Sequence, residues 1–391
     1  MYKVKALNKI SHLGLGILTD AGFDIDNDSE NPEAILVRSA KLHEMEFAPN
    51  LLCIARAGAG TNNIPIDRCA ESGIAVFNTP GANAEAVKEL VLCGLLISSR
   101  DIVGGINWVS SLADKGDEVA SLVEKGKSSF IGPEIMGKTL GVVGLGAIGA
   151  KVANAAVNLG MRVVGYDPYL SVEAALGLSR KVKIDKNLDA IYKNSDYITL
   201  QLPYIKGQTH HMINAETLAK MKDGVRIINL ARAELADDEA IKAALASGKL
   251  ARYVTDFPNG ALAGVPGVLH IPHLGASTPE SEDRCAIMAA RELIDYVKNG
   301  NIINSVNLPC LSIDRAGEGR LCVISKGNHG ILSSCVEVIT GSGLTTVNAA
   351  GRERGEYAYV IVDTNGKIEE DVAREVEKLA GVVRVRIIDK R

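Results

Sequence analysis

Residues 139–149 read TLGVVGLGAIG, and this stretch decides the fold of the central part of the chain. Its apolar first half has the length of a buried strand and leads into the spacing G-x-G-x-x-G at Gly144, Gly146 and Gly149. Apolar residues then recur at helical spacing until Gly160. A strand, a glycine turn and a helix in this order are typical of a site for the pyrophosphate of a dinucleotide.

Each glycine of this motif has a separate task. Gly144 permits the tight turn, Gly146 lets the backbone approach the phosphates, and Gly149 lets the helix pack closely on the strand. A second apolar run at 162–166 ends in Asp167, placed to accept hydrogen bonds from the ribose diol of adenosine. Because an acid repels the 2′-phosphate of NADP, the pattern predicts NAD. The alternative is a packing turn followed by a surface aspartate.

The composition of the 391-residue chain favours a multidomain α/β protein. Hydrophobic residues make up 47% and charged residues 23%, and the length suggests two or three domains, of which we expect three. The formal charge of −4 gives no electrostatic argument for nucleic acid or a membrane as partner. No membrane-spanning or targeting segment is recognisable, so we expect a cytoplasmic protein. The seven cysteines contain no C-x-x-C and are expected to be buried free thiols.

Short apolar runs at 34–39, 51–57 and 74–78 predict parallel strands of a small doubly wound unit. The pattern restarts with six predicted strands separated by helical segments, as a dinucleotide-binding sheet requires. They lie at 140–143, 162–166, 197–202, 225–230, 253–256 and 268–271. A long helix is expected at 278–299.

A glycine-bearing stretch near 315–319 has the composition of a linker. Beyond it, strands are predicted at 320–325, 346–350, 357–363 and 382–388, with helices at 330–340 and 368–379. The order strand, helix, strand, strand, helix, strand is typical of a ferredoxin-like domain.

Two residues follow predicted strands at the sheet edge where open α/β sheets bind ligands, and both suit oxidation of a hydroxy acid. Arg232 follows the strand at 225–230, and its planar guanidinium suits bidentate contact with a carboxylate. His273 follows the strand at 268–271, and an imidazole is the natural acceptor for an alcohol proton. The alternatives are a surface charge for Arg232 and a turn histidine for His273.

A metal site is not expected. His210-His211 and the pair His270 and His273 have no nearby set of ligand-type residues. The acids at 237–239 are explained by capping of a helix N-terminus.

These residues resemble the D-2-hydroxyacid dehydrogenase family over essentially the whole chain, and the tail resembles an ACT regulatory domain. The matching segments are RAGAGTNN at 56–63, NTPGAN at 78–83, GKTLG at 137–141, GLGAIG at 144–149, YDP at 166–168, NLAR at 229–232 and PHLGAST at 272–278. The resemblance implies two Rossmann-like parallel-sheet domains and a C-terminal ferredoxin-like ACT domain. The expected boundaries are 1–97 plus 277–310 for a discontinuous substrate-binding domain, 98–276 for the NAD domain and 318–391 for the tail.

The resemblance also implies roles for individual residues. Arg232 would bind the substrate carboxylate and C2 oxygen, and His273 would be the acid and base. Residues implied to contact NAD are Gly144, Gly146, Ala147, Ile148, Gly149, Asp167, Pro203, Ala231, Asp256 and Gly275. Those implied for the substrate are Arg56, Ala57, Gly58, Asn83, Arg232 and His273, with Arg38 a weaker candidate for a phosphate group.

The activity implied is NAD-dependent oxidation of 3-phospho-D-glycerate to 3-phosphohydroxypyruvate, the first step toward serine. Two alternatives stay open: a dehydrogenase of another small D-2-hydroxy acid, or an NAD-binding sensor or assembly protein with little turnover. Relatives pair through their nucleotide domains, so a homodimer or homotetramer is expected. Residues 100–109, with the only tryptophan, Trp108, could take part in pairing or lie in a monomer core.

Two departures from the family affect the site and the tail. The glutamate that pairs with the family histidine falls here on Gly260 or Ala261, and residues 257–279 contain no acid. His273 is therefore expected to take a carboxylate from elsewhere, to use a neutral partner such as Asn259 or water, or to work without a partner. In the tail, Ser325 and Gly327 stand where serine-regulated relatives carry a histidine and an asparagine, which predicts weak or absent inhibition by serine.

Overall fold

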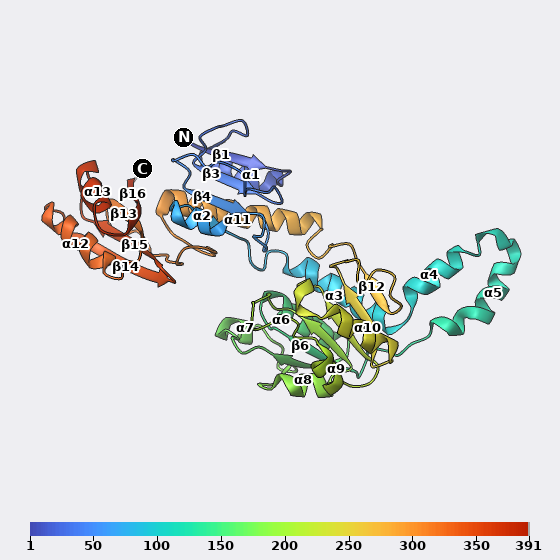
Figure 1. Cartoon of the computed structure of the whole chain (residues 1–391). Coiled ribbons are helices and arrows are strands. Elements are labelled where there is room, and N and C mark those ends of the chain that lie inside the picture. Colours follow the sequence, from blue (N-terminus) through green and yellow to red (C-terminus); the bar gives the residue numbers. More distant parts are fainter. Residues whose placement is uncertain (390–391) are drawn as a thin grey trace. The chain divides into compact units, whose positions relative to one another are not determined.

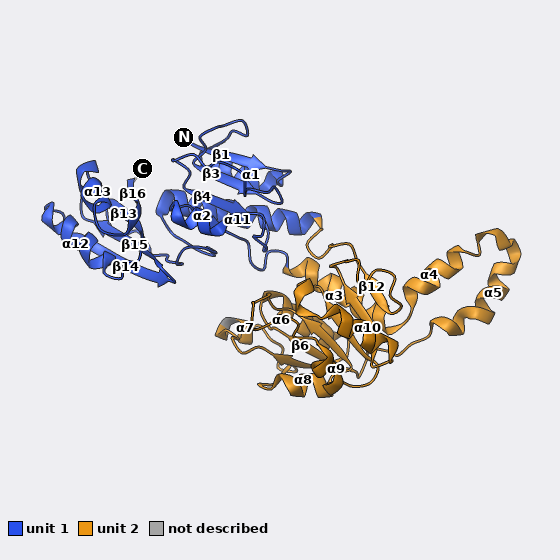
Figure 2. Cartoon of the chain, in the orientation of Figure 1, with its two compact units in different colours: residues 1–83, 279–391 blue, residues 84–278 orange. Residues whose placement is uncertain are grey.

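The computed structural model describes residues 1–389, which form two compact units. Unit 1 comprises Met1–Asn83 and Pro279–Arg391, and unit 2 comprises Ala84–Thr278 (Figure 2). Both contain parallel sheets, and unit 1 also contains an antiparallel one, which confirms the predicted fold class. Among the described residues, no helix combines the length and apolar character needed to cross a bilayer.

The first half of unit 1 is a five-stranded parallel sheet in the order β2-β1-β3-β4-β5. Three of its strands were predicted, whereas β1 and β2 were missed. Lysines alternate with apolar residues in β1, and β2 is only three residues long, so neither has the continuous apolar run of a buried strand. The elements are β1 (Tyr2–Leu7), β2 (Phe23–Ile25), β3 (Ala34–Val37), β4 (Cys53–Arg56), β5 (Ala75–Phe77), α1 (His12–Asp20), α2 (Ile66–Glu71) and α11 (Pro279–Asn299).

Unit 2 is built on a seven-stranded parallel sheet in the order β12-β11-β10-β9-β6-β7-β8. The six predicted strands are present, and the seventh, β8, is an exposed two-residue edge strand without an apolar signal. The strands are β6 (Thr139–Val143), β7 (Arg162–Tyr166), β8 (Lys183–Ile184), β9 (Tyr197–Leu200), β10 (Val225–Asn229), β11 (Leu250–Thr255) and β12 (Val268–His270). The helices are α3 (Ala84–Ser99), α6 (Ala147–Asn158), α7 (Val172–Leu176), α8 (Leu188–Asn194), α9 (Ala215–Lys220), η3 (Ala233–Leu235) and α10 (Asp238–Ala246).

The boundaries of the two units differ from the domain boundaries expected from the sequence. Helix α3 belongs to unit 2, because Val87, Val91 and Leu95 pack in one core with Leu140 and Val142 of β6. The chain therefore crosses after Asn83, not at 97/98, and returns after Thr278.

An arm leaves the body of unit 2 between α3 and β6, as Figure 1 shows. It contains α4 (Ile102–Ser110), η1 (Ala113–Glu118), α5 (Val119–Gly126) and η2 (Lys127–Phe130). Trp108 stacks on Phe130 within the arm, with ring centroids 5.2 Å apart. The alternative of Trp108 buried in a monomer core is therefore wrong: it is only half-buried.

The C-terminal part of unit 1 is a four-stranded antiparallel sheet in the order β14-β15-β13-β16, the predicted ferredoxin-like arrangement. Its elements are β13 (Gly319–Lys326), α12 (Ile331–Gly341), β14 (Thr346–Arg354), β15 (Tyr357–Thr364), α13 (Glu370–Glu377) and β16 (Val382–Asp389). One face of the sheet packs against α12 and α13. The other face contributes Cys322, Ile324, Tyr359, Ile361 and Ile388 to the core of the first half of unit 1.

Arginines of this sheet bind the C-terminal end of α11. Arg386 donates to the carbonyl oxygens of Tyr296 and Val297 at 3.2 and 2.9 Å, and Arg320 donates to that of Asn299 at 2.7 Å. The last carbonyl groups of a helix lack partners within the helix and carry partial negative charge, so guanidinium groups satisfy them well. The tail is thus anchored to the long helix of unit 1 by buried polar contacts as well as by apolar packing.

All seven cysteines are free thiols. Cys53, Cys69, Cys285, Cys322 and Cys335 are buried as expected, whereas Cys93 and Cys310 are exposed.

Replacing Arg320 by Met is expected to lower the free energy of unfolding of the full chain by about 3 kcal/mol, because it leaves a buried charge unpaired. Arg320 and Asp363 are 0% exposed and form a bidentate pair at 2.6 and 2.9 Å. Burial raises the pKa of Asp363, but hydrogen bonds from Arg320 and the Ala316 N–H outweigh this effect and hold it below its ordinary value. Urea unfolding provides the measurement. Arg374→Met, which breaks an exposed pair with Glu370, is the control and should cost less than about 0.5 kcal/mol; equal losses would contradict the anchoring role.

Candidate active site

The glycine turn after β6 has the geometry of an anion cradle. Gly144 has φ of 94°, which favours glycine, and a Cβ at Gly149 would lie 1.9 Å from the Gly144 carbonyl oxygen. A Cβ at Gly146 would meet no heavy atom within 4 Å, so the space above this residue is open. Gly146 is the N-cap of α6 and supplies no side chain to the first N–H groups, which include those of Ala147 and Ile148. An anion can therefore approach these donors directly.

Asp167 lies next to this turn at the end of β7. Its carboxylate accepts hydrogen bonds from the N–H groups of Leu145 and Tyr169 at 2.8 and 2.9 Å. Each carboxylate oxygen has a second lone pair, so both can still accept a hydroxyl proton. The bond to Leu145 ties the acid directly to the glycine turn, which is where the ribose of a dinucleotide follows its pyrophosphate.

Arg232 follows β10 and is exposed. Its Nη1 donates to the carbonyl oxygen of Ala231 at 2.6 Å, which leaves the other guanidinium donors available to a ligand. The buried Asn229 holds the backbone of Arg232 through its side-chain amide: Nδ2 donates to the Arg232 carbonyl oxygen and Oδ1 accepts from the Arg232 N–H. This role of Asn229 was not predicted from the sequence. A polar residue at the end of an otherwise apolar strand was the available signal.

His273 lies in the turn after β12 and is exposed. Its ring contacts the ring of Phe257, with centroids 5.0 Å apart. Pro203, also predicted at this edge, is exposed after β9, and Ala231 is buried after β10. The segments that follow six parallel strands of unit 2 (β6, β7, β9, β10, β11 and β12) therefore carry the predicted residues at one edge of the sheet.

Asp256 is the buried charge of this edge. It is 1% exposed, and its Oδ2 accepts a hydrogen bond from the N–H of Gly275 at 3.3 Å, whereas Oδ1 is buried without a partner. Burial raises the pKa of Asp256, and the charges of His273 and Arg232 act in the opposite direction. A buried carboxylate with one unused oxygen is the kind of group that a polar ligand completes.

The position of the family glutamate is occupied by a loop without an acid. Asn259, suggested as a neutral partner of His273, is already engaged: Nδ2 donates to Asp238 and Oδ1 accepts from the Leu262 N–H, both at 2.9 Å. Asp238 begins α10, and Asp237 is the N-cap of that helix, as predicted for these acids. The structure therefore gives no support to Asn259 as the partner of His273.

Unit 1 carries the residues predicted for the substrate other than Arg232 and His273. Arg56 ends β4, and its Nε donates to the carbonyl oxygen of Arg38 at 3.1 Å. Ala57 and Gly58 follow and are buried, and the Asn83 side-chain oxygen is buried without a partner. Arg38, the weaker phosphate candidate, forms an ion pair with Glu282 at 2.8 Å.

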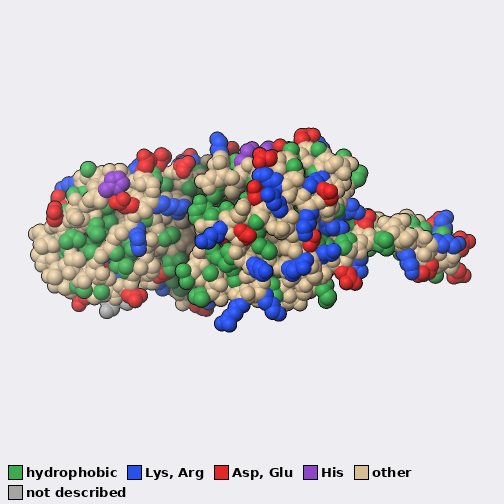
Figure 3. All heavy atoms as spheres, turned by 90° about the horizontal axis from the view of Figure 1, so that it is seen from below, with side chains coloured by type: hydrophobic (Ala, Val, Ile, Leu, Met, Phe, Trp, Pro, Cys, Tyr) green, Lys and Arg blue, Asp and Glu red, His purple; other side chains and the backbone are tan. Residues whose placement is uncertain are grey.

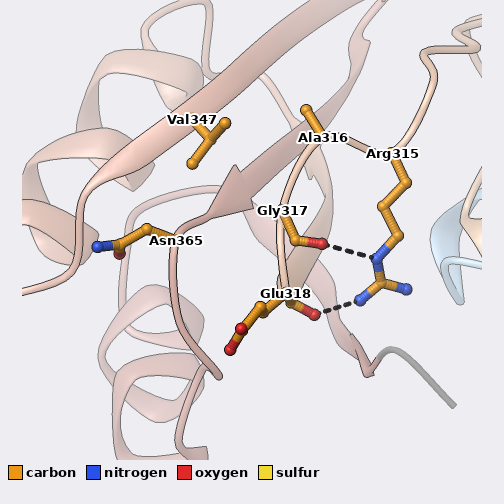
Figure 4. Close-up of a pocket in the computed structure, with 6 residues that line it drawn as sticks. All are labelled: Arg315, Ala316, Gly317, Glu318, Val347 and Asn365. Atoms are coloured by element: carbon orange, nitrogen blue, oxygen red, sulfur yellow. Dashed lines mark hydrogen bonds between the residues drawn. The ribbon is translucent and has the colours of Figure 1, made fainter.

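The tail domain has a hollow of about 290 Å³, lined by Arg315, Ala316, Gly317, Glu318, Val347 and Asn365 (Figure 4). The guanidinium of Arg315 is turned toward backbone carbonyl groups and donates to those of Gly317, Glu318 and Ile388. These bonds join the linker to the start of β13 and the end of β16. Ser325 and Gly327, the predicted counterparts of the serine-binding residues, lie at the other end of β13, where the Ser325 hydroxyl is buried without a partner.

The surface shows mixed charge. Figure 3 shows acidic and basic side chains intermixed over the face it displays, including the end of the arm. Among the residues that the structure describes, no group of three or more His, Cys, Asp and Glu is arranged to hold a metal ion.

Comparison with known proteins identifies the central part of the chain. Residues 106–275 match the family model described as D-isomer specific 2-hydroxyacid dehydrogenase, NAD binding domain. The chain is 37% identical to the hydroxypyruvate reductase of Thermotoga maritima, over 68% of this chain and 83% of that protein. It is 27% identical to D-3-phosphoglycerate dehydrogenase 1 of Saccharomyces cerevisiae, over 96% of this chain and 85% of that protein.

Other relatives are longer than this chain. It is 32% identical to D-3-phosphoglycerate dehydrogenase of Bacillus subtilis over 80% of its own length, but spans only 60% of that protein. Among solved structures, the NAD+-bound 3-phosphoglycerate dehydrogenase of Entamoeba histolytica gives a TM-score of 0.61 at 25% identity, covering 79% of this chain and 99% of that one. These similarities and the glycine turn agree on NAD as the cofactor.

Alanine at the two glycines should separate packing from ligand binding. Gly149→Ala is expected to lower stability by about 1–3 kcal/mol and to weaken NADH binding, because its Cβ would overlap the Gly144 carbonyl oxygen. Gly146→Ala should keep the wild-type melting temperature and lose NADH affinity, since its Cβ enters only the open space. Thermal unfolding and fluorescence titration with NADH measure the two effects. Gly16→Ala, in open space on α1, is the control; Gly149→Ala protein with normal NADH affinity would refute the assignment.

Proposed function

This chain belongs to the family of D-isomer-specific 2-hydroxyacid dehydrogenases, and we propose that it oxidises 3-phospho-D-glycerate to 3-phosphohydroxypyruvate with NAD, the first step of serine biosynthesis. The extent of the sequence match to relatives of known name supports this choice of substrate. The Saccharomyces cerevisiae D-3-phosphoglycerate dehydrogenase aligns with 96% of this chain, whereas the Thermotoga maritima hydroxypyruvate reductase aligns with 68%.

The residues of unit 2 fit the cofactor. The N–H groups at the start of α6 would bind the pyrophosphate, and Asp167 would accept hydrogen bonds from the adenosine ribose. Pro203, Ala231, Asp256 and Gly275 would line the nicotinamide end. When bound, NAD accepts the hydride that leaves C2 of the substrate.

Arg232 would bind the substrate carboxylate and polarise the C2 oxygen. A guanidinium makes two parallel hydrogen bonds to a carboxylate, and Asn229 holds the backbone that carries this side chain. His273 would take the hydroxyl proton while the C2–H bond breaks and the C2–O bond becomes a carbonyl. In the reverse direction, the same imidazole would return the proton to the carbonyl oxygen.

Unit 1 would supply the substrate side. We assign Arg56, Ala57, Gly58 and Asn83 to the substrate, with Arg38 as the weaker phosphate ligand because Glu282 already neutralises part of its charge. In this assignment 1–83 plus 279–310 is the substrate-binding domain and 84–278 is the NAD domain, in place of the expected boundaries at 97/98 and 276/277, and 318–391 is a regulatory or assembly domain. The seven free thiols support a reducing, cytoplasmic location.

A second candidate activity is reduction of hydroxypyruvate or another small 2-oxo acid. The 37% identity to the Thermotoga maritima hydroxypyruvate reductase favours it. Both activities use the same hydride and proton transfers. They differ only in the substituent that the substrate carries in place of the phosphate group of 3-phosphohydroxypyruvate.

The substrate preference can be tested by following the oxidation of NADH with one 2-oxo acid at a time. The expected order of kcat/KM places 3-phosphohydroxypyruvate above hydroxypyruvate, glyoxylate and 2-oxoglutarate. His273→Gln should lower kcat by about 10²–10⁴-fold with unchanged NADH affinity. His329→Gln, at an exposed histidine of the tail, is the control and should leave kcat unchanged. Preference for hydroxypyruvate would favour the second candidate, and NADH binding without turnover would favour a sensor or assembly protein.

We also propose that the chain forms a homodimer or homotetramer through the arm. The apolar residues Ile102, Val103, Ile106 and Val109 of α4 are 37%, 40%, 60% and 44% exposed, at spacings that place them along the helix surface. A second copy of the arm would bury them.

Ile106→Glu is expected to yield a monomer, because a carboxylate in an apolar helix contact costs several times the thermal energy. Light scattering coupled to size exclusion gives the mass. Leu176→Glu introduces the same charge at an 82% exposed site on α7 and should leave the mass unchanged. A wild-type mass equal to one chain would refute the proposal.

A further inference from the structure

Glu292 is a buried acid on α11 that forms no ion pair with any of the described residues 1–389. It is 8% exposed, and its Oε1 accepts a hydrogen bond from Nδ2 of Asn304 at 2.6 Å. Its Oε2 is buried and has no partner among these residues. A carboxylate in such a place is costly, because neither water nor a cation compensates its charge, whereas a neutral carboxyl buries no charge.

The surroundings of Glu292 favour the neutral form. Burial raises the pKa of Glu292 to about 8, and the hydrogen bond from Asn304 opposes this rise. The other ionisable side chains of this region have partners of their own or face solvent. They are Asp295, which accepts from Asn299 and Asn301; Arg386, which lies over the Tyr296 ring; Arg354, which donates to the Ser305 carbonyl oxygen; and Arg291, which is exposed.

Asn304 connects Glu292 to a turn that is assigned to the substrate. Asn304 has a φ of 56°, a left-handed conformation that needs support from its surroundings, and its side chain is bound to Glu292. Its carbonyl oxygen accepts the N–H of Asn78 at 3.4 Å, and Nδ2 of Asn78 donates to the carbonyl oxygen of Ala59 at 2.6 Å. Ala59 directly follows Gly58, one of the residues assigned to the substrate. A series of three hydrogen bonds therefore runs from the buried acid to the turn after β4.

Ionisation of Glu292 would disturb this series at its first bond. A buried carboxylate without a cation would admit water or move toward solvent. Either change would displace the side chain of Asn304 and remove the support of its left-handed backbone. The uncharged carboxyl keeps the bond to Asn304 without this penalty.

Building on the proposed function, we propose that Glu292 is a positioning residue that supports substrate binding only in its uncharged form. Its neutral carboxyl holds Asn304, and Asn304 and Asn78 hold the turn after β4 in the shape that binds the 2-oxo acid. Substrate affinity therefore falls when one buried side chain ionises, although that side chain lies outside the set assigned to substrate and cofactor.

The pH dependence of KM for 3-phosphohydroxypyruvate tests the proposal. Glu292→Gln keeps an acceptor for Asn304 and cannot ionise, so its KM should equal that of the wild type at neutral pH. Above pH 8 the ratio of wild-type KM to Glu292→Gln KM should rise about 10-fold per pH unit, because only the fraction with neutral Glu292 binds substrate. The ratio removes the titration of His273, which both proteins share. Glu292→Met lacks the bond to Asn304 and should raise KM at every pH.

Asp295→Asn is the matched control, since it removes a partly exposed carboxylate from the same helix and should reproduce the wild-type KM at each pH. A ratio of wild-type to Glu292→Gln KM that does not change with pH would overturn the proposal. A KM of Glu292→Gln that is raised at neutral pH as much as that of Glu292→Met would do the same, because it would show that the charged form is the one required.

Thermal unfolding reports the uncharged state without any turnover. The folded chain keeps the Glu292 proton up to about pH 8, whereas a carboxyl with its ordinary pKa of 4.5 loses it in the unfolded chain. The stability that this group contributes is therefore full below pH 4.5 and is lost as the pH rises to 8. The melting temperature of the wild type should fall relative to that of Glu292→Gln over this range. A difference that is independent of pH would overturn the uncharged state.

The amide NMR shifts of Gly58 and Ala59 separate this proposal from the proposed function. They should titrate near pH 8 in the wild type and should not do so in Glu292→Gln. A wild-type protein that shows this titration but reduces no 2-oxo acid would overturn the proposed activity and keep the link between Glu292 and the turn. Shifts that do not titrate would overturn the link whatever the activity.

Discussion

Parallel pairing of the strands from β6 to β12 is the constraint on which the site depends. Because all carboxyl ends of a parallel sheet meet at one edge, the glycine turn, Asp167, Arg232, Asp256 and His273 are brought to that edge from distant points in the chain. The pairing also orders them, since β6 is an inner strand of the sheet and β12 is an outermost strand. The glycine turn and the residues proposed for proton transfer thus take their places from one pattern of backbone hydrogen bonds.

The second constraint lies in α11. The helix begins directly after the turn that carries His273 and ends where Arg386 and Arg320 bind its last carbonyl groups. The tail is therefore part of the packing of unit 1: its sheet contributes to the same core as β1 and β4. The commitment of Arg315 to three carbonyl oxygens stiffens the linker that joins the two parts.

Much of the fold was predictable because its signals are local. The apolar runs that become β6 and β10 are almost wholly buried, and the turn at Gly144 requires a backbone conformation that few other residues adopt. β1 and β8 were not predicted, because lysines interrupt the apolar pattern of β1 and both residues of β8 are exposed to solvent. The sequence placed helix α3 in the substrate-binding domain, but it packs in unit 2. Its apolar face indicates that the helix packs against a sheet but does not indicate which one.

The site divides in the same way. The amino-acid sequence by itself determined the glycine turn, the acid after β7 and the presence of an arginine and a histidine after their strands, because each depends only on residues adjacent in the chain. Only the tertiary structure decided that Asn259 is bound to Asp238, that Asn229 holds Arg232, and that Asp256 reaches the His273 turn with one oxygen to spare. These are contacts between segments far apart in the chain, and burial and hydrogen-bond geometry exist only once the strands have paired.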